Sequence, residues 1–285
     1  MYKNFEIAAL DFNVKYRKFP QENAITQIQN FTNEIALALV IFGLLFIAFA
    51  KFKKEDELTA KLRLDALQWG ILVNYILYYM AYISHVILIE TGVYKAKGLF
   101  GPYGETDFNL YHLFTPLLIF VLRFYYLIYS RRDRFRVPKL TYLPYFPFRV
   151  VSKWGSFLCL TIPLLLQIDL NVIIEIDESL ANKFWIALGI CHLLLPLFLL
   201  LWAFSKNANE DEFTKQLRLE SMQLAILFNY GLLLAANMFV FEGSFLGIMG
   251  LHMISPLLFF IIIFNFICNK HYWQVMREVK GGLLS

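Results

Sequence analysis

Hydrophobic residues of this chain fall in long runs that are separated by short polar segments. Crossing roughly 30 Å of hydrocarbon takes about 20 helical residues. Six runs reach that length, at 34–51, 66–86, 110–129, 184–204, 221–241 and 247–267. A seventh run, 155–175, is apolar but is interrupted by Pro163, Gln167 and Asp169. The pattern predicts an all-α protein, a polytopic membrane helix bundle with about seven spans.

The distribution of basic residues predicts the orientation of this bundle. Cytoplasmic segments of membrane proteins are enriched in Lys and Arg. If the first run starts outside, eighteen Lys and Arg residues lie in the inner segments and seven in the outer ones. We therefore predict an N-terminus outside and a cytoplasmic C-terminus. The N-terminal tail then lies outside the cell or at the membrane interface.

An internal repeat is the strongest signal in the sequence. Residues 55–75, EDELTAKLRLDALQWGILVNY, match residues 210–230, EDEFTKQLRLESMQLAILFNY, at 12 of 21 positions. A second match pairs HLFTPLL, from His112, with HMISPLL, from His252. Such self-similarity indicates a duplicated structural unit. The charged start of each copy follows an apolar run, so we expect both copies to face the cytoplasm.

Two three-span units can share an orientation only if an odd number of crossings separates them. The repeat therefore predicts that 155–175 is a seventh span, in a 3+1+3 parallel arrangement. In topology alone this plan resembles that of the SWEET sugar carriers. The Pro-Gln signature of that family is absent from the runs, since the one Pro-Gln pair, Pro20-Gln21, lies in the tail.

The repeat also divides the chain into segments. We predict an N-terminal tail (1–33), a first three-helix repeat (34–130), a basic and aromatic cytoplasmic loop (131–153), a linker helix and loop (154–183), a second three-helix repeat (184–268) and a cytoplasmic C-terminal tail (269–285).

Repeated polar residues within the runs are the first candidate site. If the helix enters the membrane near residue 64, Asn74 lies about ten residues further on, or roughly 15 Å into the membrane. A polar group at that depth must avoid lipid, because an unmet polar group in hydrocarbon costs several kcal/mol. The set could line a binding site between the repeats, or it could join helices by hydrogen bonds. Its members are Gln68, Asn74, Tyr75, Gln223, Asn229 and Tyr230.

The repeated charged motif is a second candidate, as an inner gate or a docking surface. Its residues are Glu55, Asp56, Glu57, Arg63, Glu210, Asp211, Glu212 and Arg218. A structural explanation is also available. Asp56 or Thr59, and Asp211 or Thr214, could cap the following helix. Glu57 with Lys61 and Asp211 with Lys215 have the spacing of ion pairs within one turn.

His112 and His252 form a third candidate, a pair in the outer leaflet. Each is followed four residues later by a proline. Paired imidazoles could hold haem or a metal, or could relay protons. They could equally serve only as hydrogen-bonding groups in the bundle.

The composition narrows the class of function. The chain is 59% hydrophobic and 17% charged, and its net charge of +4 is spread between the runs, which does not indicate nucleic-acid binding. The three cysteines have no paired spacing. We find no nucleophile–base pair and no phosphate loop, so no enzyme class is indicated. The sequence favours a small-molecule or ion carrier in the lipid bilayer. A scaffold or assembly subunit that docks a cytoplasmic protein is an alternative, and a haem or metal redox protein is a remote one.

Overall fold

Helices make up most of the chain in the computed structural model, which describes residues 11–16, 25–30, 32–50, 57–90, 112–130, 142–162, 178–208, 210–240 and 243–282. The long ones are α1 (Thr32–Phe49), α2 (Glu57–Glu90), α4 (Thr115–Ser130), α6 (Glu178–Ala203), α7 (Glu212–Phe239) and α8 (Gly243–Gly282). A short helical turn, η3 (Tyr145–Arg149), leads into helical residues 150–162. Each of the six uninterrupted runs thus coincides with a helix. Of the seventh run, residues 163–175 lie outside the described part.

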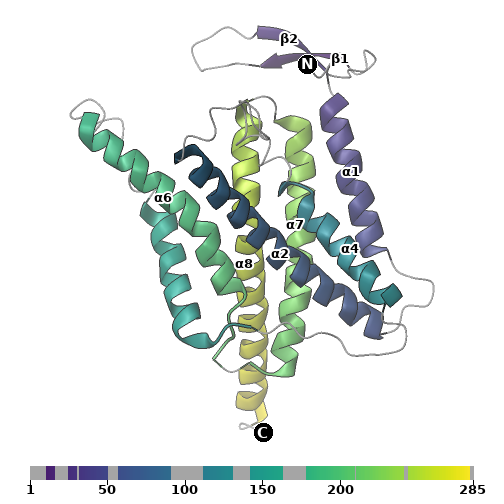
Figure 1. The fold of residues 1–285 in the computed structure, drawn as a ribbon. Helices are drawn as coiled ribbons and strands as arrows, with labels where there is room; N and C mark the ends of the chain where they lie inside the picture. The colour runs from purple at the N-terminus through teal and green to yellow at the C-terminus, as the bar shows by residue number, and fades with distance from the viewer. Residues whose placement is uncertain are drawn as a thin grey trace.

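The two copies of the charged motif start equivalent helices. α2 begins at Glu57 and α7 at Glu212, which are matching positions of the repeat. The Asp211 side chain accepts a hydrogen bond from the Thr214 amide at 2.8 Å and caps α7. This confirms the predicted cap for the second copy, whereas Glu55 and Asp56 lie outside the described residues. Both helices begin at the lower end of the bundle in Figure 1.

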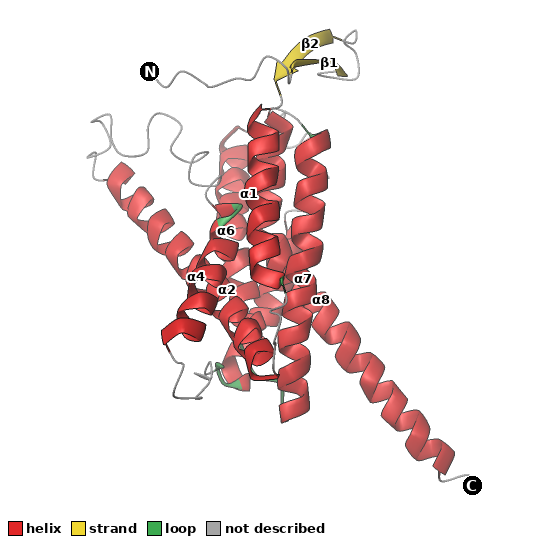
Figure 2. Cartoon of the chain, turned by 90° about the vertical axis from the view of Figure 1, so that its right-hand side faces the viewer, coloured by secondary structure: helices red, strands yellow, loops and turns green. Residues whose placement is uncertain are grey.

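The helices pack in two similar groups. In the first half α4 packs against α1 and α2, and in the second half α8 packs against α6 and α7. Helix α7 also contacts α1 and α2, so it joins the halves. Figures 1 and 2 show the helices gathered into one bundle, from which the C-terminal part of α8 projects.

The crossing of α2 and α4 depends on a glycine. A Cβ atom at Gly70 would lie 2.9 Å from the backbone nitrogen of Phe120, which is closer than real contacts allow. Small residues at helix crossings let two backbones approach in this way. At the matching positions of the second half stand Ala225 and Phe260, both fully buried. The second half thus also has a small residue and a phenylalanine at these two positions.

The outside of the bundle is apolar. Four large apolar side chains are each more than 60% exposed: Phe46, Leu122, Phe239 and Phe266. Surfaces that face water rarely expose large patches of apolar side chains. Among the described helices, Glu212–Phe239 and Gly247–Tyr272 are long and apolar enough to cross a membrane. Together these features support a membrane protein.

A β-hairpin precedes the helices. Strands β1 (Asp11–Tyr16) and β2 (Ile25–Asn30) pair antiparallel, with Asp11 opposite Asn30. Figure 1 shows the hairpin beyond the N-terminal end of α1. The predicted tail, 1–33, therefore includes regular structure that the hydrophobic runs did not indicate.

Candidate functional site

Six polar residues form what we call the central cluster: the buried Asn74, His112, Asn229 and His252, and the half-buried Thr115 and Ser255. In the first half the Asn74 amide nitrogen lies 2.9 Å from Nδ1 of His112, and the Thr115 hydroxyl donates to Oδ1 of Asn74 at 2.5 Å. These contacts join α2 to the segment that starts α4. The amide thus connects an imidazole and a hydroxyl.

The second half repeats this arrangement at the matching positions. The Asn229 amide nitrogen lies 2.9 Å from Nδ1 of His252, and the Ser255 hydroxyl donates to Oδ1 of Asn229 at 2.5 Å. Both asparagines and both histidines are at most 6% exposed. In an apolar interior such groups are stable only when they are hydrogen-bonded to one another.

The two halves of the central cluster meet at the histidines. The ring centroids of His112 and His252 lie 6.3 Å apart, with the rings nearly perpendicular. The asparagines bond within their own halves, so the imidazoles are the groups that come together between the copies. Nε2 of His252 is buried and has no hydrogen-bond partner among the described residues.

Tyrosines surround the two imidazoles. The Tyr75 ring lies 5.5 Å from that of His112, and the Tyr230 ring lies 5.2 Å from that of His252. Tyr78 also packs on His112, at 5.3 Å. The Tyr75 hydroxyl donates to the Met253 carbonyl at 2.6 Å, which links α2 to α8 across the halves.

The arginines of the charged motif point into the bundle. Arg63 donates to the carbonyl of Ala50, just after α1, and Arg218 donates to that of Ala203, the last residue of α6. The last carbonyls of a helix lack partners within it and carry partial negative charge. Each arginine therefore caps the helix that precedes its own.

Aromatic rings complete both arginine sites. The Arg63 guanidinium lies 5.2 Å from the Phe124 ring centroid, and that of Arg218 lies 4.9 Å from Phe264, which occupies the matching position. Arg63 is 7% exposed and Arg218 is fully buried. A partner protein could therefore reach little of either side chain.

Arg218 also takes part in a second group of contacts. We call Gln68, Tyr142, Glu210 and Arg218 the inner cluster. Glu210 Oε2 lies 3.0 Å from Nη2 of Arg218, with both side chains buried, and it also accepts the Asn207 amide. The Tyr142 ring lies 4.6 Å from the guanidinium.

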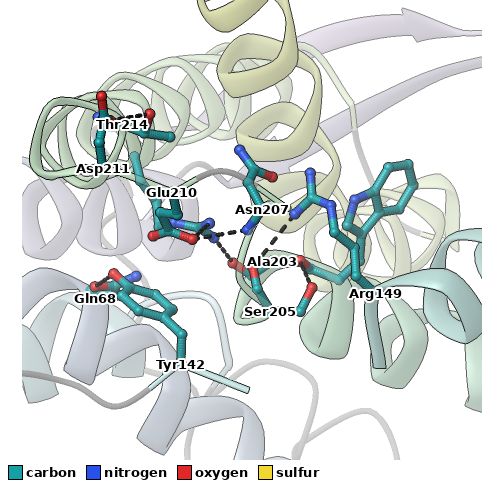
Figure 3. Close-up of polar contacts among 11 residues, drawn as sticks. Gln68, Tyr142, Arg149, Ala203, Ser205, Asn207, Glu210, Asp211 and Thr214 are labelled. Atoms are coloured by element: carbon teal, nitrogen blue, oxygen red, sulfur yellow. Dashed lines mark hydrogen bonds and ion pairs between the residues drawn. The ribbon is translucent and has the colours of Figure 1, made fainter. Parts of the chain in front are cut away.

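Tyr142 connects this ion pair to the first half. Its hydroxyl donates to Gln68 Oε1 on α2 at 2.7 Å. The backbone of the next residue, Leu143, exchanges hydrogen bonds with Phe204 and Lys206 at the end of α6. Figure 3 shows Tyr142 beside Gln68, with Glu210 and the loop through Asn207 around them. Tyr142 and Leu143 thus tie α2 to the turn between α6 and α7.

The exposed residues of the motif differ from the arginines. Glu57 and Lys61 form the expected ion pair at 2.8 Å, with side chains 84% and 56% exposed, and the hydrogen bond from Lys61 lowers the pKa of Glu57. In the second copy the Asp211 carboxylate accepts the Thr214 hydroxyl at 2.6 Å, and this bond lowers the pKa of Asp211. Its only described bond to Lys215 is through the backbone. Glu212 is exposed.

Sequence reasoning missed several of these residues. Thr115 and Ser255 could have been found, because both copies keep a hydroxyl three residues after the histidine. Tyr142 lies outside the repeat and carries no signal of its own. Asp65 and Arg123 form a 3.7 Å ion pair over Trp69 that has no equivalent in the second half, where Glu220, Ile263 and Leu224 stand. Gln223, unlike Gln68, is only half-buried.

Within the described part of the chain, no three His, Cys, Asp or Glu side chains stand together as a metal site would need. Comparison with models of protein families, with curated proteins and with solved structures finds no match for this chain.

Proposed function

We propose that the chain is a multi-pass membrane protein with seven spans in the 3+1+3 arrangement, and that it carries a small molecule or an ion. The recurrence of the Asn–His–hydroxyl contacts and of the Arg–carbonyl contacts supports two equivalent units. So does the packing of α4 and α8, each on the two helices before it. We assign the helical residues 150–162 to the start of the connecting span.

One observation carries the carrier proposal: His112 and His252, from matching positions of the two units, meet at 6.3 Å inside the bundle. In carriers with parallel repeats the binding site lies between the units, near the midplane. Burying polar groups in an apolar interior costs free energy, and ionisable residues that are kept there despite this cost typically have a function.

The inner cluster suits a gate. Tyr142 joins the halves through one hydroxyl hydrogen bond and one ring contact with Arg218. Breaking these two contacts does not separate any ion pair, because Glu210 remains bound to Arg218 within the second half. The halves could then part at this end while the charges stay paired.

Docking of a cytoplasmic partner by the charged motif is the second candidate. The exposed Glu57, Lys61 and Glu212 are available for it. The burial of Arg63 and Arg218 favours the carrier, since the basic group common to both copies points inward.

Spin-label distances in lipid nanodiscs test the carrier. A variant without native cysteines receives labels at Lys61 and Lys215, exposed positions near the starts of α2 and α7. A carrier gives two distance populations, and Tyr142→Phe enriches the longer one because the tie to Gln68 is lost. A single population that Tyr142→Phe leaves unchanged refutes the proposal.

Two controls accompany this measurement. Labels at Lys61 and Tyr129, both exposed and within the first half, should give one distance in every variant. Labelling of Lys61→Cys and Lys215→Cys by a membrane-impermeant maleimide tests the topology. Reaction of both from the cytoplasmic side is expected, and reaction from opposite sides refutes the 3+1+3 plan.

A further inference from the structure

We infer that the central cluster binds an uncharged small molecule bearing hydroxyl groups; this inference rests on the proposed carrier function. The first reason is the absence of charge. The described groups that hydrogen-bond to or pack on the two imidazoles include Asn74, Asn229, Tyr75, Tyr78 and Tyr230, none of which carries a charge at neutral pH. A charged ligand would be buried there without a counter-charge, which is strongly unfavourable.

The hydrogen-bond directions give the second reason. The Thr115 and Ser255 hydroxyls donate to the amide oxygens, so each amide presents its N–H group to the imidazole beside it. Nδ1 of each ring is then the acceptor, and the ring proton resides on Nε2. Both imidazoles can therefore donate a hydrogen bond from Nε2.

One of these donors lacks a protein acceptor. Nε2 of His252 is buried, and no described residue accepts from it. Buried N–H groups are nearly always paired, so an unpaired one indicates a missing partner such as water or a ligand. A ligand oxygen would satisfy it.

A hydroxyl group matches this environment. Its oxygen can accept from the Nε2–H group of His252 without bringing a charge into the apolar interior. The tyrosine rings beside the imidazoles offer flat apolar walls to a carbon skeleton.

Nitrogen-15 NMR of histidine-labelled full-length protein in phosphatidylethanolamine and phosphatidylglycerol liposomes tests this inference. At pH 7.5 the His112 and His252 signals, assigned with His112→Gln and His252→Gln, should report neutral rings with the proton on Nε2. The probes are glycerol, erythritol and xylitol, and each is compared with its carboxylate analogue. A polyol should shift the Nε2 signal of His252 saturably, whereas no carboxylate should.

The exposed His271 is the internal control and should not respond. Ser255→Ala should weaken polyol binding about 2- to 10-fold, since the amide loses the hydroxyl that orients it. Ser84→Ala is the matched control, because that hydroxyl is exposed and bonds to Ala81 of its own helix. It should leave binding unchanged.

Each of three results would overturn the inference: ring protons on Nδ1, no response of the His252 signal to any polyol, or equal responses to polyols and carboxylates. These outcomes leave the carrier proposal intact if the spin labels still show two populations. A single distance population together with polyol binding would mean instead that the ligand site is real and the transport role is wrong.

Discussion

Replacing Arg218 with methionine should destabilise the protein severely. The substitution keeps much of the aliphatic stem but removes the guanidinium that binds Glu210 at 3.0 Å and the Ala203 carbonyl at 2.8 Å. It leaves the Glu210 carboxylate, whose side chain is 4% exposed, without its counter-charge. Breaking a buried ion pair from one side costs about 3–5 kcal/mol. We expect a loss of that size in the free energy of unfolding.

Unfolding by SDS in mixed micelles, followed by the helical circular dichroism signal, measures this loss. Arg218→Met combined with Glu210→Gln should be less destabilising than Arg218→Met alone, because no unpaired charge remains. Lys61→Met is the control. Its partner Glu57 is fully solvated, so no measurable change is expected. If Arg218→Met were as mild as Lys61→Met, the buried ion pair would not stabilise the bundle, and our account of the inner cluster would be wrong.

Three further outcomes follow from the same structure and can be measured by the same unfolding assay. Gly70→Ala should lower the free energy of unfolding by about 1–3 kcal/mol through overpacking. A Cβ atom at Gly231 would have nothing within 4 Å, so Gly231→Ala should raise the free energy of unfolding by up to about 1 kcal/mol. Equal effects of the two substitutions would contradict the close crossing. Tyr75→Phe should cost about 0.6–1.7 kcal/mol, as for other hydrogen bonds between membrane helices, and no loss would mean that the bond is not formed. Asp211→Ala should destabilise the protein at pH 6 but not near pH 2. The hydrogen bonds from Thr214 lower the pKa of Asp211, so the cap is intact above the unfolded-state pKa of about 3.9 and is lost as pH falls through the lower folded-state pKa. A destabilisation that does not depend on pH would contradict this.

Helix positions could be predicted from the sequence because they depend on local properties. Runs of apolar residues satisfy their backbone groups internally as helices, and this requires no knowledge of neighbours. The cap at Asp211 is equally local, since donor and acceptor are three residues apart. The β-hairpin was missed because only short alternating segments, such as Phe12, Val14 and Tyr16, indicate it.

The candidate site was predicted in part. Depth in the run identified Asn74 and Asn229 as costly polar groups, and both proved to be buried. Their partners could not be derived, because contact with His112 and His252 depends on how α4 and α8 are rotated against α2 and α7. The sequence shows that the histidines are equivalent, but it contains no information on their 6.3 Å separation.

The arginines of the motif show a different limit. A charged string beside a predicted span is usually solvated, and the sequence favoured a capped, positively flanked helix start over a gate or docking surface. Arg63 and Arg218 instead turn inward, because the preceding helix ends beside them with free carbonyls. That geometry depends on the turn between two helices, which no local pattern specifies.

The contact between each arginine and the end of the preceding helix bears on how the chain enters the membrane during synthesis. In the proposed topology, a nascent chain that has completed α1 or α6 alone still has bare carbonyls at the cytoplasmic face. The missing donor arrives only with the first two turns of α2 or α7. We therefore expect α1 with α2, and α6 with α7, to leave the translocon as hairpins and not one helix at a time.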